Sequence, residues 1–191
     1  NHIINGTTDW VYEEEFAFTQ GFKWSPDGDK IAFYKFDESR VKVFHMNMFK
    51  GQLYPEDYAF KYPKAGEKNS IVKIFVYDLN DGSNKEMDTG EETDQYIPRI
   101  KWTPDNNELA MIRMNRLQNH VEILFADATS GESEVVYSEK NPYYISEIND
   151  KYPTFLEDGE HFIIYSEKDG YNHLYLYDME GNLINQITKG N

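Results

Sequence analysis

Short apolar segments rich in Ile, Val, Phe and Tyr recur along the chain, separated by turns of Pro, Asp, Gly and Asn. Such segments are typical of β-strands. The recurring unit is an aromatic residue with a turn, then an apolar strand, then a further apolar strand that ends on Asp. The aromatic turns are residues 24–28, 102–106 and 155–159. The strands are predicted at residues 30–34, 108–112 and 161–165, and the strands ending on Asp at 74–78, 122–127 and 174–178.

The first repeat is longer than the other two. From the aromatic residue to the closing Asp it spans 54 residues, against 25 in the second repeat and 23 in the third. The difference indicates an insertion of roughly thirty residues, which we place at residues 41–70. Its aromatic residues and its two glycines predict a surface hairpin whose role is to cover an edge of the neighbouring sheet.

Repeats of about four short antiparallel strands predict an all-β fold built from β-propeller blades. Residues 1–191 would form about three to four four-stranded blades, whereas a closed ring needs about four to eight blades of about 40 to 45 residues. We therefore expect an incomplete propeller, either a fragment of a longer protein or part of a ring that other chains complete. The first is favoured because the chain starts directly in a predicted strand at residues 2–4, followed by an Asn-Gly turn.

One helix is predicted, starting after Asp9, whose side chain can cap the first turn formed by residues 10–12. Glu13, Glu14 and Glu15 follow directly. Two carboxylates held in place suit a cationic ligand such as the free amino terminus of a peptide, which has three N–H donors and a pKa of about 7.7 to 8.0. The alternative is a solvated acidic face, which is the commoner meaning of such a run in an acidic protein.

Charge and composition narrow the classes of ligand. The chain has 34 acidic and 19 basic residues and a net charge of −15, which opposes binding of nucleic acid. The absence of cysteine excludes thiol nucleophiles, disulfides and thiolate metal sites. The five histidines lack metal-ligand spacing, so we expect neither a metal nor a cofactor. No apolar run approaches the roughly 20 residues of a membrane helix.

Several motifs in order give the chain a likeness to a known family. They are residues 5–6, 9–15, 24–28, 62–66 with Asn69, 72–73, 115–119 and 187–190. On these motifs nearly the whole chain resembles the amino-terminal propeller region of the dipeptidyl peptidase IV family of serine exopeptidases. The resemblance implies an eight-bladed propeller that caps an α/β-hydrolase domain, which would lie outside this chain.

The resemblance also implies a function. Glu14 and Glu15 would bind the free amino terminus of a peptide with Pro, or less readily Ala, at position 2, so that the parent enzyme releases dipeptides and the propeller gates substrate entry. Glu13 would face solvent. The Gly-x-Ser-x-Gly nucleophile motif is absent, so this chain alone should be inactive. The family further implies a homodimer located in the periplasm or at the cell surface, and the missing cysteines favour a bacterial-type member.

Parts of the family's site do not carry over. The arginine that contacts the substrate carbonyl lies upstream in the family and has no counterpart here. A serine three residues after the second glutamate aligns with Phe18, and an aromatic residue that lines the pocket falls near Ile148. An aromatic residue of segment 143–145 could take its place. The resemblance also gives the insertion a second possible role, at a subunit contact or the cavity rim.

The aromatic residues that open the repeats, Trp24, Trp102 and Phe155, are predicted to be blade-core residues. Two other functions stay open. One is a non-catalytic propeller that binds proteins, with the acidic run as surface decoration or a docking site for a basic partner. The other is the propeller of a related oligopeptidase or acylaminoacyl peptidase, which needs no free amine on its substrate.

Overall fold

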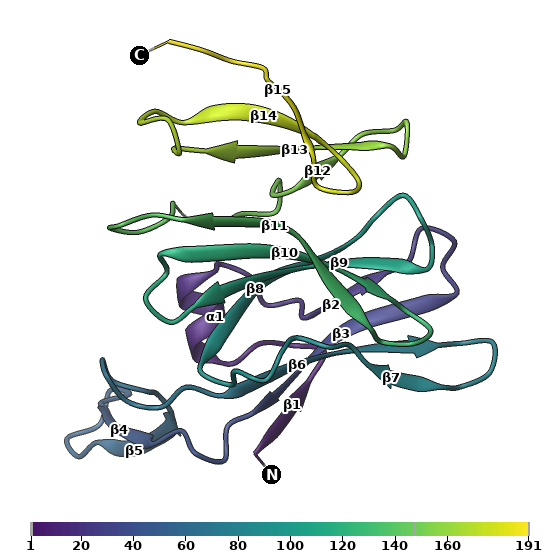
Figure 1. The fold of residues 1–191 in the computed structure, drawn as a ribbon. Helices are drawn as coiled ribbons and strands as arrows, with labels where there is room; N and C mark the ends of the chain where they lie inside the picture. Colours follow the sequence, from purple (N-terminus) through teal and green to yellow (C-terminus); the bar gives the residue numbers. More distant parts are fainter. Residues whose placement is uncertain (1, 147, 191) are drawn as a thin grey trace.

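The computed structural model describes residues 2–146 and 148–190 as three antiparallel sheets lying one above another, with a small separate hairpin (Figure 1). The first sheet has β1 (Ile3–Asn5), β2 (Phe22–Trp24), β3 (Lys30–Asp37), β6 (Ile71–Asp78) and β7 (Asn84–Glu86). The second has β8 (Gln95–Trp102), β9 (Glu108–Asn115), β10 (His120–Asp127) and β11 (Ser133–Lys140). The third has β12 (Thr154–Phe155), β13 (His161–Ser166), β14 (His173–Asp178) and β15 (Leu183–Gln186).

Each sheet is a propeller blade, and in the second and third sheets strands adjacent in sequence pair side by side. The orders are β8 to β11 and β12 to β15 without a crossover, and the first sheet follows β1-β3-β6-β7 with β2 also paired to β3. The prediction of an incomplete set of four-stranded propeller blades is therefore confirmed. Three blades form an open stack in the described residues.

The turn before β3 shows how the Ser, Asp and Gly that follow the aromatic residue of the first repeat form a tight turn. Ser25 donates its hydroxyl to Asp27 at 2.6 Å and accepts the Lys30 backbone N–H at 2.9 Å. Gly28 follows with φ +80°, the left-handed region that glycine enters without a steric penalty. Hydroxyl, carboxylate and glycine together reverse the chain into the next strand, as the aromatic turn pattern predicts.

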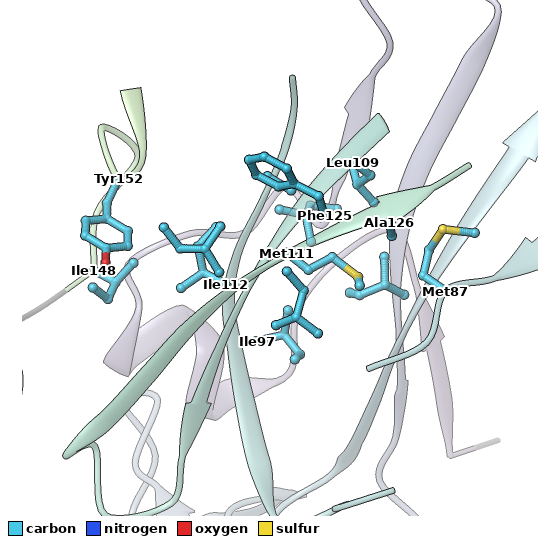
Figure 2. Packing of buried hydrophobic residues seen from close by; sticks show 14 of the residues in the cluster. Met87, Ile97, Leu109, Met111, Ile112, Phe125, Ala126, Ile148 and Tyr152 are labelled. Atoms are coloured by element: carbon cyan, nitrogen blue, oxygen red, sulfur yellow. The ribbon is translucent and has the colours of Figure 1, made fainter. Parts of the chain in front are cut away.

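The core lies between the blades, and the middle blade is buried on both faces. Figure 2 shows Ile97, Met111, Ile112 and Phe125 from β8, β9 and β10 packed among buried neighbours. All but one of the residues of β8 are buried, whereas burial alternates along β3 and β13. A sheet covered on both faces loses the polar half of its alternation, which explains the nearly continuous apolar run of residues 109–112.

The blade-core prediction holds for two of the three aromatic residues. Trp102 is buried, and its indole N–H donates to the Lys23 carbonyl at 3.1 Å, while Phe155 packs against the core. The prediction is wrong for Trp24, which is 51% exposed. Its strand, β2, has only three residues and lies at the edge of the first sheet, where fewer neighbours cover a side chain.

Within residues 41–70, β4 (Val43–Met48) and β5 (Glu56–Lys61) pair only with each other and project from the blades (Figure 1). The predicted surface hairpin is therefore present, while its covering of a sheet edge stays a prediction, because in the described residues neither strand pairs with a blade. The hairpin carries exposed apolar side chains. The largest of these are Phe49, Leu53, Tyr54 and Tyr58. None of the helices in the described part of the chain is long and apolar enough to cross a membrane.

Candidate functional site

The predicted helix lies on a loop that interrupts the edge strand of the first blade. β1 and β2 both pair with β3 on the same edge, β1 opposite residues 35–37 and β2 opposite residues 31–33. The chain leaves the sheet after β1 and returns before β2, so residues 6–21 form what we call the helix loop. Asn5-Gly6 is therefore not a hairpin turn as the sequence predicts, because the strand after it pairs with β3 and not with β1.

Two glycines close the neck of the helix loop. The Gly6 N–H donates to the Tyr34 carbonyl at 3.0 Å, and the Gly21 N–H donates to the Gly6 carbonyl at 3.1 Å. The Tyr34 N–H in turn donates to the Gly21 carbonyl at 2.9 Å. A Cβ on Gly21 would lie 2.8 Å from the Thr7 carbonyl oxygen, so only glycine allows the two ends of the loop to approach this closely.

The helix α1 (Trp10–Glu15) is capped at both ends. Asp9 accepts the Tyr12 N–H at 3.0 Å and the Ser70 hydroxyl at 2.6 Å, which confirms its predicted role as the N-cap. Burial raises the pKa of Asp9, against the opposing effect of the hydrogen bond from Ser70. After the helix, Ala17 has φ +53°, so the chain turns sharply away from α1.

Residues of the second blade fix α1 in place. Tyr12 is 1% exposed, and its hydroxyl accepts the Ile97 N–H from β8 at 2.8 Å. Arg99, also on β8 and buried, donates Nη2–H to the Phe16 carbonyl at 2.8 Å, directly after the helix. The Asp150 carboxylate lies 2.8 Å from Arg99 Nε. These contacts fix both the axis and the rotation of a helix too short to be stable alone.

The same arrangement turns the acidic residues outward. With Asp9 and Tyr12 buried, the side chains of Glu13, Glu14 and Glu15 are exposed. Within the described residues no hydrogen bond or ion pair engages Glu14, whereas Glu15 Oε1 accepts the Gln118 side-chain amide at 2.6 Å. Both residues of the sequence-predicted pair are therefore exposed on an anchored helix, and their carboxylates keep oxygens available to a ligand.

Polar groups near Glu15 form hydrogen bonds and an ion pair around Tyr96. Burial raises the pKa of the neighbouring Tyr96 hydroxyl, and the negative charge of Glu15 adds to that rise. Asn69 donates to the Tyr96 hydroxyl at 3.0 Å. The Arg116 guanidinium lies 5.8 Å from the Tyr96 ring centre and forms an ion pair with Asp94 at 2.8 Å. Arg116 is thus held by its own partners on the rim of the site.

Other predicted positions behave differently from the glutamates. Phe18 is half-buried, packs on Tyr12 and lies beneath Arg99, so this position supplies an aromatic ring and no hydroxyl. Ile148 is 1% exposed and belongs to the core, and this position supplies no aromatic ring. Tyr143 and Tyr144 are exposed. Among the residues that the structure describes, no three His, Asp or Glu side chains gather in a way that could hold a metal ion.

Sequence reasoning missed the residues that hold the site together. Ser70, Arg99 and Gln118 lie 55 or more positions from α1 in the chain, and a single sequence does not show which of its polar residues meet. A partial signal existed, because Asn69 and the segment 115–119 are among the motifs quoted for the family resemblance. The structure places Gln118 of this segment on Glu15 and Asn69 on Tyr96, whose hydroxyl senses the charge of Glu15.

Comparison with known proteins agrees with this architecture. The family model "Dipeptidyl peptidase IV (DPP IV) N-terminal region" matches residues 1–191. The crystal structure of Porphyromonas gingivalis dipeptidyl peptidase 4 matches with a TM-score of 0.93 and 42% sequence identity, over 100% of this chain and 27% of that one.

Two relatives carry names other than dipeptidyl peptidase 4. The inactive dipeptidyl peptidase 10 of Rattus norvegicus is 32% identical over 168 residues, which cover 85% of this chain and 21% of the relative. The prolyl endopeptidase FAP of Mus musculus is 30% identical over 207 residues, which cover 100% of this chain and 27% of the relative. The chain thus spans about a fifth to a quarter of the length of the curated relatives that it matches.

Proposed function

Because this chain belongs to the dipeptidyl peptidase IV family, whose N-terminal region it matches along its whole length, we propose that it binds the substrate amino terminus in a serine dipeptidyl peptidase. Glu14 and Glu15 bind the free ammonium group of a peptide, and the enzyme releases Xaa-Pro or Xaa-Ala dipeptides. The observation that carries the proposal is the anchoring of α1, which buries Asp9 and Tyr12 and leaves both carboxylates exposed.

The chemistry of the pair fits an ammonium ligand. Glu14 and Glu15 are adjacent in a helix and both exposed, so they place two negative charges at one end of α1, where a cation is attracted. An ammonium group offers three N–H donors, and hydrogen bonds between charged groups are worth about 1.5 to 3 kcal/mol each, less where the carboxylates stay hydrated.

Rigid binding of the amine also sets the length of the product. If the amino terminus is held at one point, only the bond at a fixed distance along the peptide reaches the nucleophile. The nucleophile, its base and its orienting acid would come from an α/β-hydrolase domain of the same polypeptide, because this sequence has no Gly-x-Ser-x-Gly motif. The propeller then gates and positions the substrate, and the hydrolase domain cleaves it.

Two relatives each favour a different alternative function. One relative is named inactive dipeptidyl peptidase 10, which favours, as one alternative, a non-catalytic binding role for this chain. A relative named prolyl endopeptidase favours cleavage inside a peptide chain as another. The first predicts binding of a basic partner that weakens with salt, and the second predicts turnover of amino-terminally acetylated substrates.

The test compares carboxamide variants in the full-length polypeptide. Glu14→Gln and Glu15→Gln keep size and remove charge, so each should lower kcat/KM for a Gly-Pro amide about 10- to 100-fold, as expected for losing a charge-assisted hydrogen bond. Glu13→Gln, on the same exposed helix, is the matched control and should change it less than 2-fold. Wild-type kcat/KM in the Glu14→Gln, Glu15→Gln double variant would exclude the proposed clamp.

The exposed hairpin supports a further part of the proposal, a homodimer. Residues 43–61 carry two lysines and two acidic residues, so this segment is neutral in a chain of charge −15. Two copies would repel each other least where the surface is neutral and apolar. Export to the periplasm or the cell surface completes the proposal, and cell fractionation with an antibody to the propeller tests it.

A further inference from the structure

We propose that Gln118 is the positioning residue of the amine site: its side-chain amide fixes Glu15 in the orientation that receives the ammonium group. The inference rests on the proposed function of Glu14 and Glu15. Its basis is the 2.6 Å hydrogen bond from Gln118 Nε2 to Glu15 Oε1, which joins the second blade to the helix loop of the first.

Gln118 is presented by a turn that is unusually well fixed. It lies between β9 and β10 with φ +54°, a left-handed conformation that is unfavourable for a residue with a Cβ. Its backbone N–H donates to the Asn115 carbonyl at 2.9 Å, and Asn115 Oδ1 accepts two further backbone N–H groups, those of Asn119 and His120, at 3.0 Å each. The turn therefore holds the amide in place before any substrate arrives.

The same residue connects the site to a third segment. The Gln118 carbonyl accepts the Ile145 N–H at 2.8 Å, and the Asn119 carbonyl accepts the Asn141 N–H at 2.9 Å. Tyr143 and Tyr144, both exposed, lie between these two attachments. The amide of Gln118 thus reaches the carboxylate pair while its backbone holds the aromatic segment, so one residue sets the spacing between the two.

A neutral amide is the appropriate donor for this task. It occupies one lone pair of Glu15 Oε1 and leaves Oε2 and the remaining lone pair for the substrate. An arginine or lysine at the same position would orient Glu15 equally well but would neutralise it and compete with the ammonium group. Gln118 orients the carboxylate and preserves its charge.

The central test is Gln118→Asn in the full-length polypeptide. Asn keeps the amide and tolerates the left-handed turn better than Gln, but it is one methylene shorter and cannot make the same bond. We expect KM for a Gly-Pro amide to rise about 3- to 10-fold, the equivalent of one hydrogen bond, with normal thermal stability. Gln118→Lys should raise KM further. Leu117→Ala, an exposed neighbour in the same turn, is the control and should leave KM unchanged.

A double-mutant cycle separates positioning from a structural effect. If Gln118 acts through Glu15, then Gln118→Asn should change kcat/KM less than 2-fold once Glu15→Gln is present, whereas a structural effect would persist in full. An equal loss in both backgrounds overturns the inference. If Glu15→Gln lowers kcat/KM and Gln118→Asn does not, the inference alone fails. If Glu15→Gln has no effect, the proposed function fails and the inference fails with it.

Discussion

The first blade carries two additions of opposite character. The helix loop, residues 6–21, interrupts an edge strand and is tied down by the buried side chains of Asp9 and Tyr12. The β4–β5 hairpin, residues 43–61, is inserted between two paired strands, β3 and β6, and pairs only with itself. Its large apolar side chains are exposed, Leu53 at 93%.

The difference shows what each kind of addition can do. A loop fixed by hydrogen bonds to the neighbouring blade can hold charges at defined positions, as ligand binding requires. A hairpin joined to the sheet only at its base presents a surface but no fixed geometry. One ring contact links the two additions, between Trp10 on α1 and Tyr62 after β5, at 4.2 Å between ring centres. The following variants test whether this contrast holds.

The largest expected effect comes from one glycine in each addition, at the neck of the helix loop and at the tip of the hairpin. Gly21→Ala would place a Cβ 2.8 Å from the Thr7 carbonyl oxygen, and this backbone clash should lower the free energy of opening of residues 6–21 by about 2–3 kcal/mol. Gly51→Ala, at the hairpin tip, meets nothing within 4 Å and costs only its left-handed φ of +79°, about 1 kcal/mol. Hydrogen exchange measured by mass spectrometry on the full-length polypeptide resolves both segments.

These two glycine variants also test the assignment of each addition. Faster exchange should be confined to residues 6–21 in Gly21→Ala and to residues 43–61 in Gly51→Ala. If the two substitutions speeded hydrogen exchange in their own segments by the same factor, the view that the helix loop is the fixed addition would be contradicted.

A smaller effect is expected from the hydroxyl of Tyr12. Tyr12→Phe leaves the Ile97 N–H buried without its acceptor, which should cost about 1–3 kcal/mol and loosen α1. The proposed amine clamp lies on α1, so kcat/KM for a Gly-Pro amide should fall as well if the proposal holds. Tyr58→Phe, exposed on the hairpin, is the matched control and should change stability by less than about 0.5 kcal/mol. An unchanged exchange rate in residues 6–21 of Tyr12→Phe would show that the hydroxyl is not an anchor.

Local chemistry explains why part of this arrangement could be predicted from sequence. The strands after Trp102 and Phe155, the Ser25 turn and the Asp9 cap all depend on neighbours within a few residues. The propeller repeat then follows because each unit repeats the same local signals. The helix start and the acidic run after it are contiguous in the chain, so the exposed helix end could be predicted locally, whereas the choice of Glu14 and Glu15 as ligands came from the family resemblance and stays a prediction.

The remaining features depend on contacts that no local pattern contains. The exposure of Trp24 follows from the edge position of β2, and the role of Asn5-Gly6 follows from the interrupted strand. Ser70 and Gln118 contact the helix loop from segments that are distant in the chain, through their hydrogen bonds to Asp9 and Glu15. Tertiary pairing decides these features, so residue type alone cannot predict them.

The buried carboxyl of Asp9 predicts how the stability of the helix loop depends on pH. Burial raises its pKa, so the folded state binds a proton more tightly than the unfolded state, and Asp9 stabilises the fold less as pH rises from about 4 through the raised pKa. The charge of Asp9 also raises the pKa of Glu38, which burial already raises, so both groups act in the same direction. Asp9→Asn keeps a capping side chain and removes this dependence. Relative to Asp9→Asn, the wild type should lose stability between pH 4.5 and pH 7, measured by exchange of residues 6–21. A difference that does not vary with pH, or that grows in favour of the wild type, would contradict the assignment.

The smallest effect on folding is expected at the hairpin surface. Leu53→Ser with Tyr54→Ser removes two exposed apolar side chains and should change the free energy of opening by less than about 0.5 kcal/mol. The same variant should weaken self-association of the full-length polypeptide in light scattering, since it removes neutral apolar surface from a chain of charge −15. Leu117→Ser, which alters an exposed residue outside the hairpin, is the control. Unchanged self-association would assign the dimer contact elsewhere, and a large loss of stability would mean that the hairpin, like the helix loop, is anchored to the blades.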